Sequence, residues 1–190
     1  MKIVVTGGPG GGKTTALDLF RRELLGEVEI VPESATAIFS SGVCRDDRDE
    51  VVKAIQKMIY YFQVNMESLY QKQRPNKVYL CDRGTLDGLA YWPESEERFF
   101  ETTKSDLETE LKRYDAVIFF ETAAKTGNDI STNNSYRNET TVEAIKLDDK
   151  LQTIWRQHPN FYLVKSQGSF MGKINAGIEV IKEVLGKDHE

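Results

Sequence analysis

The first residues with a clear chemical use form the stretch TGGPGGGKTT, at positions 6–15. Gly7, Gly12, Lys13 and Thr14 match the pattern G-x-x-x-x-G-K-[ST]. Glycines let backbone N–H groups converge on an anion, while lysine adds a cation and threonine a metal-binding hydroxyl. The pattern predicts a loop that holds the phosphates of a nucleoside triphosphate. We expect contacts from Gly8, Pro9, Gly10, Gly11, Gly12, Lys13, Thr14 and Thr15.

The residues around this loop support the same interpretation. The apolar run 2–7 has the length of a strand, and residues 13–25 have the spacing of an amphipathic helix. A dinucleotide loop of the G-x-G-x-x-G type does not fit, since Lys13 and Thr15 occupy positions where glycine is required. Starting the pattern one glycine earlier places Pro9 in the second glycine position. We therefore expect ATP, in preference to GTP, bound with Mg²⁺.

A second group of chemically suggestive residues follows the apolar run 77–82. Asp82 ends this predicted strand and is expected to share the metal with Thr14, since phosphoryl transfer needs a carboxylate near the cation. Asp82-Arg83-Gly84 resembles the acid–arginine pair of nucleoside and nucleotide kinases, which implies a catalytic Arg83 near the transferred phosphate or the acceptor. A mechanical AAA+ ATPase would have two acids in tandem, and a small GTPase would have glycine at position 85. Both alternatives fit poorly.

Glu33 is the next candidate catalytic residue. It lies just past the predicted strand 28–31, and ligands of open α/β sheets gather outside the carboxyl ends of the strands. A glutamate at this place accepts the proton of the attacking hydroxyl in deoxynucleoside kinases. The resemblance implies that role for Glu33, and the alternative is an acid that favours the start of a helix.

Two further predictions concern an acceptor and the phosphates. Gln63 lies on the long helix 50–73, where nucleoside kinases carry a glutamine that binds the base, although packing beside the helix's apolar face explains it equally well. The polar residues 123–138 follow a buried strand, and kinases of this type place a phosphate-covering LID there. We expect a LID-like segment at about 123–140, with Arg137 as its catalytic cation and Lys125 as second choice. A solvated loop is the alternative.

The whole pattern of apolar runs predicts an α/β fold. Expected strands cover residues 2–7, 28–31, 77–82, 115–122 and 161–165. Helices alternate with them over 13–25, 34–41, 50–73, 85–92, 139–157 and 170–185, with one or two more within 95–114. Strands alternating with helices favour a parallel sheet covered on both faces. We expect one three-layer P-loop domain, residues 1–190, with five strands. Asp49, Ser105 and Ser169 are the predicted helix caps.

Composition limits the possible partners. The net charge is −5 and no strong basic block occurs, so we do not expect nucleic-acid binding. No apolar run reaches the length of about 18 residues that a membrane span needs. Cys44 and Cys81 lack CxxC spacing, so neither a disulfide framework nor a zinc site is expected, and the cytoplasm is the expected location. The oligomeric state stays open.

The stretches GGPGGGKTT, VPESA, DRGTLDGLAYW and YRNETTVEAIKLDDKLQTIWRQHP together resemble a kinase-like P-loop family. It is often labelled AAA domain or NadR-type ATPase, and it includes the nicotinamide-riboside kinase domain of the bacterial NAD regulator. The resemblance implies phosphoryl transfer from ATP to a small-molecule hydroxyl. It also implies that Asp87 and Tyr91 belong to the site on the acceptor side, where Asp87 could assist acceptor or metal binding, or simply cap its helix. The alternative function is a nucleotide-dependent regulatory ATPase or switch without an acceptor.

Overall fold

The protein is described here by a computed structural model, which places residues 1–24, 26–126, 140–166 and 169–186. Its centre is a five-stranded parallel sheet with the strand order β2-β3-β1-β4-β5. The strands are β1 (Lys2–Thr6), β2 (Val28–Val31), β3 (Val78–Asp82), β4 (Ala116–Phe120) and β5 (Phe161–Val164). All five lie where the sequence predicts them, and the expected α/β fold is confirmed.

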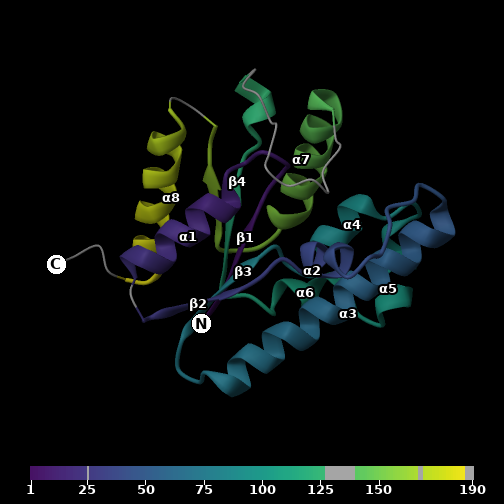
Figure 1. Cartoon of the computed structure of the whole chain (residues 1–190), viewed down its shortest axis with the longest axis horizontal. Coiled ribbons are helices and arrows are strands. Elements are labelled where there is room, and N and C mark those ends of the chain that lie inside the picture. Colours follow the sequence, from purple (N-terminus) through teal and green to yellow (C-terminus); the bar gives the residue numbers. More distant parts are fainter. Residues whose placement is uncertain (25, 127–139, 167–168, 187–190) are drawn as a thin grey trace.

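Helices connect the strands and cover both faces of the sheet. They are α1 (Lys13–Glu23), α2 (Ser34–Ser40), α3 (Asp49–Gln73), α4 (Asp87–Tyr91), α5 (Glu96–Thr103), α6 (Leu107–Leu111), α7 (Thr141–Trp155) and α8 (Phe170–Val184), with a 3₁₀ turn η1 (Ala123–Thr126). Figure 1 shows α1 and α8 on one side of the sheet, and α7 with the α3–α6 group on the other. The three-layer arrangement follows from the alternation of strands and helices.

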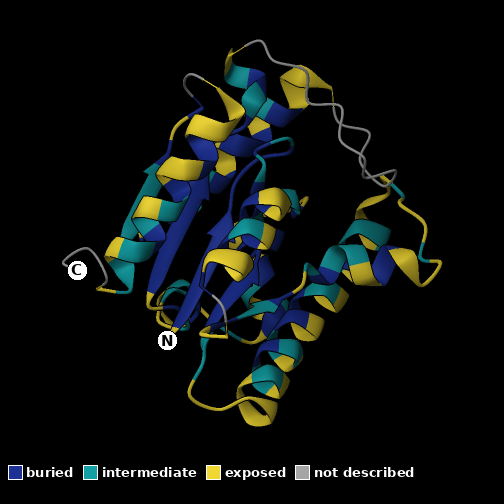
Figure 2. Cartoon of the chain, turned by 60° about the vertical axis from the view of Figure 1, so that its left-hand side comes forward, coloured by how far each residue is buried: buried dark blue, intermediate teal, exposed yellow. Residues whose placement is uncertain are grey.

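The core is divided by the sheet into two apolar layers. Ile3 and Val5 of β1 pack toward α1 and α8, while Val4 between them packs toward α7. This alternation is the two-residue period of a strand with both faces covered. The central strands are accordingly buried along their length (Figure 2), with β1 and β4 buried at every position. A rigid sheet therefore carries the loops at its carboxyl edge.

Two predicted helix caps are wrong and one is confirmed. Asp49 is the first residue of α3, and its N-cap is Arg48. Helix α6 is capped by Asp106, whose carboxylate accepts from the Thr109 backbone N–H, while the Ser105 hydroxyl donates to Glu110 instead. Asp106 caps the helix because the Ser105 side chain is used in a hydrogen bond to the buried Glu110. Ser169 caps α8 as predicted, accepting from the Gly172 N–H.

Helix α4 is shorter than the predicted range 85–92. The Thr85 backbone N–H donates to the Tyr114 hydroxyl, 2.9 Å away, instead of lying within a helix, and Leu86 becomes the N-cap. Helix α7 starts two residues later than predicted, at a capping box made by Thr140 and Glu143. Both shifts reflect polar contacts that hydrophobic spacing does not reveal.

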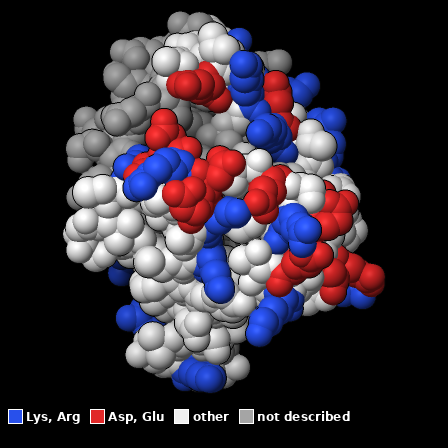
Figure 3. Space-filling model, turned by 90° about the vertical axis from the view of Figure 1, so that its right-hand side faces the viewer, with Lys and Arg blue, Asp and Glu red and all other residues white. Residues whose placement is uncertain are grey.

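Charged side chains of both signs are intermixed on the face of the molecule shown in Figure 3. The ion pairs with both partners exposed, such as Arg98–Glu101 and Lys112–Glu108, stabilise the fold only slightly. Buried charges, in contrast, lie at the carboxyl edge of the sheet, among them Lys13, Asp82 and Arg83.

Candidate functional site

The P-loop, residues 7–14, joins the carboxyl end of β1 to the start of α1. Gly7 has φ 134°, and a Cβ there would lie 2.0 Å from the Phe120 carbonyl oxygen, so only glycine fits. Gly12 is the N-cap of α1 and provides no side-chain cap. The first N–H groups of α1 are thus not occupied by a cap side chain, which is the arrangement that binds anions at a helix N-terminus.

Lys13 lies inside this loop. Its side chain is almost completely buried, and its ammonium group donates to the carbonyl oxygens of Gly7 and Gly8, each 2.8 Å away. Thr14 and Thr15 follow on the first turn of α1 and are exposed. The loop therefore combines a fixed cation, a helix N-terminus and an accessible hydroxyl, as the motif predicts for phosphate and metal binding.

Asp82 lies beside the P-loop because β3 and β1 are neighbours. The parallel register pairs Asp82 with Val5, near the end of the strand that leads into the loop. The Thr14 hydroxyl and the Asp82 carboxylate offer the oxygen ligands that Mg²⁺ prefers, with water and phosphate oxygens to complete its shell. In the part of the chain that the structure describes, no group of three or more His, Cys, Asp or Glu side chains is arranged to hold a metal without such help.

Arg83 connects the P-loop to Glu33 and Asp87. Its Nε donates to Glu33 at 2.6 Å, and its Nη1 donates to Asp87 at 2.8 Å and to the Gly7 carbonyl at 3.4 Å. Burial lowers the pKa of this guanidinium, but Tyr91, Glu33 and Asp87 raise it by more, so Arg83 stays charged.

The backbone of Arg83 is in the left-handed region, at φ 71°. A non-glycine residue there costs free energy, typically about 1–2 kcal/mol. The conformation turns the chain at the end of β3, while the Arg83 N–H still donates to the Val5 carbonyl at 3.0 Å. Strain of this kind is concentrated at functional sites, and here it belongs to the residue that links three segments of the site.

Asp87 is a buried support for Arg83. Besides Arg83, its carboxylate accepts from the Thr6 hydroxyl at 2.7 Å, the Trp155 indole N–H at 2.9 Å and the Gly84 N–H at 3.2 Å. It is the first residue of α4, so it does not cap that helix. The carboxylate is therefore used to join β1, α4 and α7 beneath Arg83.

Glu33 lies at the N-cap position of α2, two residues after the end of β2, but makes no side-chain cap hydrogen bond. Its two oxygens accept instead from Arg83 Nε and from the Thr36 hydroxyl. The side chain keeps an exposed fraction of 12%, so it reaches the surface of the site. The structure thus brings Glu33, Arg83 and the P-loop together, as the strand-end positions predict.

Gln63 and Tyr91 differ in their accessibility. Gln63 is buried on α3; its amide oxygen accepts from Ser34, and its amide nitrogen donates to Glu67 at 2.9 Å and to the Arg83 carbonyl at 3.3 Å. Gln63 therefore stabilises the turn at Arg83 through a hydrogen bond to its backbone. A role for Gln63 in binding a base stays a prediction. Tyr91 is half-buried at the end of α4, next to Arg83.

The predicted LID-like segment is only partly described. Arg137 lies outside the described residues. Lys125, in η1, is 2.8 Å from both Asp148 and Asp149 and 3.5 Å from Glu121. Three carboxylates thus surround this ammonium group, so Lys125 has a structural role as their counter-ion close to the P-loop.

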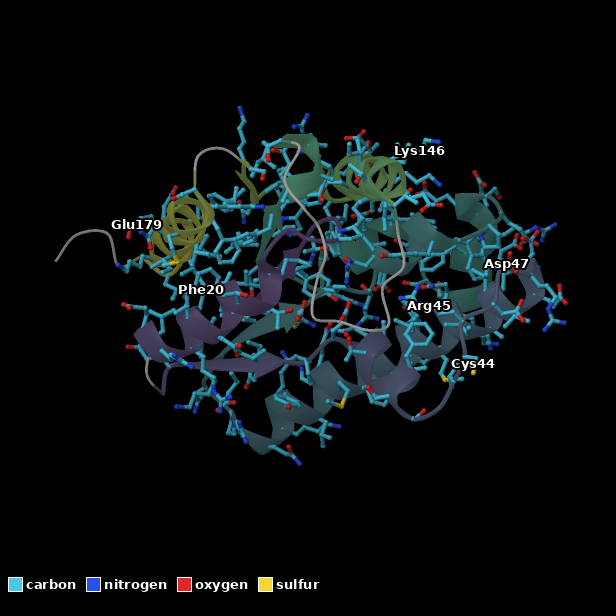
Figure 4. The ribbon with its side chains drawn as sticks, turned by 45° about the horizontal axis from the view of Figure 1, so that its top comes forward. Phe20, Cys44, Arg45, Asp47, Lys146 and Glu179 are labelled. Carbon is cyan, nitrogen blue, oxygen red and sulfur yellow. The ribbon has the colours of Figure 1, made fainter. Side chains whose placement is uncertain are left out.

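Figure 4 shows these elements from the carboxyl side of the sheet. Phe20 marks α1 and Glu179 marks α8 on one side, while Lys146 on α7 and Arg45 after α2 lie on the other. Arg45 lies over the Phe39 ring, with 4.6 Å between the guanidinium carbon and the ring centroid. Helix α2 and the connection that follows it therefore add an aromatic ring and a cation to the side of the molecule that carries Glu33.

Asp148 is a buried acid that the sequence interpretation missed. Its side chain lies on α7 among the core positions Ala144, Leu147 and Leu151, and its carboxylate accepts from the backbone N–H groups of Gly8 and Thr122. The sequence did contain a signal for Asp148, because it is an acid within the apolar face of a predicted helix. A buried acid needs a hydrogen-bond or charge partner, so such a position indicates a polar contact in the core.

The parallel sheet, its strand order and the P-loop between β1 and α1 define a P-loop NTPase. Comparison with known families agrees: the family model described as AAA domain matches residues 2–172. The chain therefore belongs to the AAA domain family, and its P-loop is a nucleotide-binding site. No curated protein matches the chain. Among the described residues, no helix is both long and apolar enough to cross a membrane.

Proposed function

We propose that the protein is a kinase that transfers the γ-phosphoryl group of ATP to a hydroxyl group of a small molecule such as a nucleoside. The observation that carries this proposal is the position of Arg83, which joins Glu33 to the first carbonyl of the P-loop. Phosphorylation of an acceptor hydroxyl needs a carboxylate that takes its proton and a cation that orients it, and both groups lie beside the phosphate loop here. The resemblance to NadR-type kinases points the same way.

On the donor side, the P-loop N–H groups and Lys13 bind the β- and γ-phosphates. Thr14 and Asp82 would hold Mg²⁺, which would neutralise part of the phosphate charge. Arg137 is proposed to approach the transferring group from the LID-like segment and to stabilise its charge in the transition state. The donor side thus contributes mainly position and electrostatic stabilisation.

On the acceptor side, Glu33 takes the proton from the acceptor hydroxyl as the oxygen attacks the γ-phosphorus, while the bond to the β,γ-bridging oxygen breaks and ADP leaves. The ion pair with Arg83 favours the ionised carboxylate that this step needs. Arg83 also lies between Glu33 and the loop, so it can orient the acceptor and approach the transferred group. Tyr91 and the Phe39–Arg45 pair are proposed to line the acceptor pocket, whose occupant is a compound with a free hydroxyl.

The test is a transfer assay with labelled ATP and Mg²⁺ against nucleosides, nicotinamide riboside and aminoglycoside-like alcohols. We expect one class of acceptor to be phosphorylated. Glu33→Gln should slow transfer by about 10²-fold or more, because a positioned base typically contributes that much, while nucleotide affinity changes little.

The matched control is Glu29→Gln. Glu29 is also paired with an arginine, Arg74, but it lies within β2, outside the site. Its substitution should leave transfer unchanged. Slow release of inorganic phosphate with no labelled product from any acceptor would contradict the kinase assignment.

The second candidate function is a nucleotide-dependent regulatory ATPase or switch without a small-molecule acceptor, which is equally compatible with the AAA domain match. It predicts that nucleotide changes the recovery of a partner protein in a pull-down. Equal recovery with and without nucleotide, together with phosphorylation of a small molecule, would decide for the kinase.

A further inference from the structure

Asp148 makes contacts that join three elements at the nucleotide site. Its side chain is fully buried on α7, and a single oxygen, Oδ1, accepts from the Gly8 N–H at 2.8 Å and the Thr122 N–H at 2.9 Å. Gly8 belongs to the P-loop, and Thr122 follows β4. One carboxylate oxygen therefore ties α7 to both segments.

Gly8 is glycine because of this contact. A Cβ at Gly8 would lie 2.6 Å from Asp148 Oδ1 and 2.7 Å from Asp148 Cβ, closer than packed atoms approach. The sequence motif predicts Gly8 and Pro9 as phosphate contacts. In the structure the Gly8 N–H is directed to Asp148, and proline has no N–H to offer.

The first half of the loop is held from the β4 side as well. The Thr122 hydroxyl donates to the Pro9 carbonyl, and Gly7 lies against the Phe120 carbonyl. These contacts give the two halves of the P-loop different roles. Residues 7–9 are anchored to the rest of the protein, and residues 10–14 remain to present N–H groups to phosphate.

The buried charge of Asp148 has a counter-ion. Lys125 Nζ lies 2.8 Å from Asp148 Oδ2 and equally far from Asp149 Oδ1. Burial lowers the pKa of Lys125, but its hydrogen bonds with Asp148 and Asp149 raise it by more, so the ammonium stays charged. A fully buried carboxylate is tolerated only with such a partner and hydrogen bonds.

We propose that Asp148 is a positioning residue of the nucleotide site, which fixes the first half of the P-loop so that the second half is preorganised for phosphate. The proposal rests on nucleotide binding by the proposed kinase, and it does not depend on the acceptor. Lys125 acts in it as the counter-ion of Asp148. Preorganisation of this kind raises affinity by removing the cost of ordering the loop.

The experiment measures the affinity of the full chain for a fluorescent ADP analogue with Mg²⁺. Asp148→Ala removes both hydrogen bonds to the backbone and should weaken binding by about tenfold or more. Asp148→Asn keeps an acceptor oxygen but places an amide beside the Lys125 ammonium, so an intermediate loss is expected. The double variant Asp148→Asn/Lys125→Met removes both charges and keeps the acceptor, so it should return to within about threefold of the original affinity.

A buried acid elsewhere provides the matched control. Glu110 is fully buried and accepts from Tyr60 and Arg113, between α3 and α6. Glu110→Gln should lower the melting temperature without changing the affinity of the folded protein. Affinities are measured well below each melting temperature, so that stability and binding are separated.

Two results would overturn the proposal. One is an Asp148→Ala protein that is folded and binds the analogue as well as Glu110→Gln does. The other, which applies even if Asp148→Ala fails to fold, is a folded double variant that binds no better than Asp148→Asn. Normal binding without phosphorylation of any acceptor would instead contradict the kinase assignment and leave the role of Asp148 intact. An original chain that binds no nucleotide would overturn both.

Discussion

At the scale of single residues, the site depends most on Arg83. It is buried, its backbone is strained, and its guanidinium joins Glu33, Asp87 and the Gly7 carbonyl. A guanidinium presents its N–H donors in a rigid planar arrangement, whereas the three donors of an ammonium group rotate on a flexible stem. The strain in the backbone is maintained because these partners hold the side chain in place.

Replacing Arg83 tests this dependence. Arg83→Met leaves Glu33 and Asp87 without their cation, and loss of one partner of a buried ion pair lowers the free energy of unfolding by about 3 kcal/mol or more. Arg74→Met breaks the more exposed pair with Glu29 and should cost at most about 1 kcal/mol. Urea denaturation measures both. Equal losses in the two variants would contradict the central position of Arg83.

Motif residues could be predicted from the sequence because their chemistry is local. The loop around Lys13 is a run of adjacent residues, while Asp82 ends one recognisable strand and Glu33 lies just past another. Their arrangement at one edge follows from the parallel sheet. The support of the site could not be predicted in the same way. Asp148 contacts Gly8, 140 positions away, and Trp155 contacts Asp87, 68 positions away.

At the scale of elements, α7 is the helix that the site depends on. It carries Asp148 under the P-loop and Trp155 under Asp87. A Cβ at Gly84 would lie 2.7 Å from the Trp155 ring, so the turn after β3 also packs directly on this helix. The start of α7 is fixed by the Thr140–Glu143 capping box, which the hydrophobic spacing did not reveal.

The capping box gives a prediction for α7. Thr140→Ala removes the side chain that accepts from the Glu143 N–H and should lower the free energy of unfolding by about 1 kcal/mol. Thr153→Ala, on the exposed side of the same helix, should be neutral or slightly stabilising, since alanine has the higher helix propensity. Thermal unfolding compares the two. A larger loss from Thr153→Ala would show that the cap contributes little.

At the scale of the whole molecule, the sheet order explains why the site is assembled where it is. Strand β1 lies between β3 and β4, so the P-loop has the β3 turn on one side and the β4 end on the other. The fold could be predicted from the sequence because alternating buried strands and amphipathic helices admit few arrangements. The polar contacts that lock α7 and α8 to that sheet depend on distances that no local pattern encodes.

The docking of α8 on β4 buries Lys173, and this contact makes stability depend on pH. Its ammonium donates to the Glu121 carbonyl and lies 5.9 Å from the centre of the Phe120 ring. Burial lowers the pKa of Lys173 from 10.5 to about 8, although the charges of Asp148 and Glu121 oppose the shift. The neutral form is therefore easier to bury than the charged form.

The sign of the effect follows from proton binding. Between pH 8 and 10.5 the unfolded chain holds the Lys173 proton and the folded chain has lost it, so raising the pH through this window favours folding. Below pH 8 both states are protonated, and the folded state bears a burial penalty on the order of 2 kcal/mol or more. Lys173→Met removes that penalty. We expect the free energy of unfolding of the original chain, minus that of the variant, to rise with pH across this window. Tyrosines and cysteines that titrate there are common to both proteins and cancel in the difference, so a flat difference would show that the Lys173 ammonium is not desolvated.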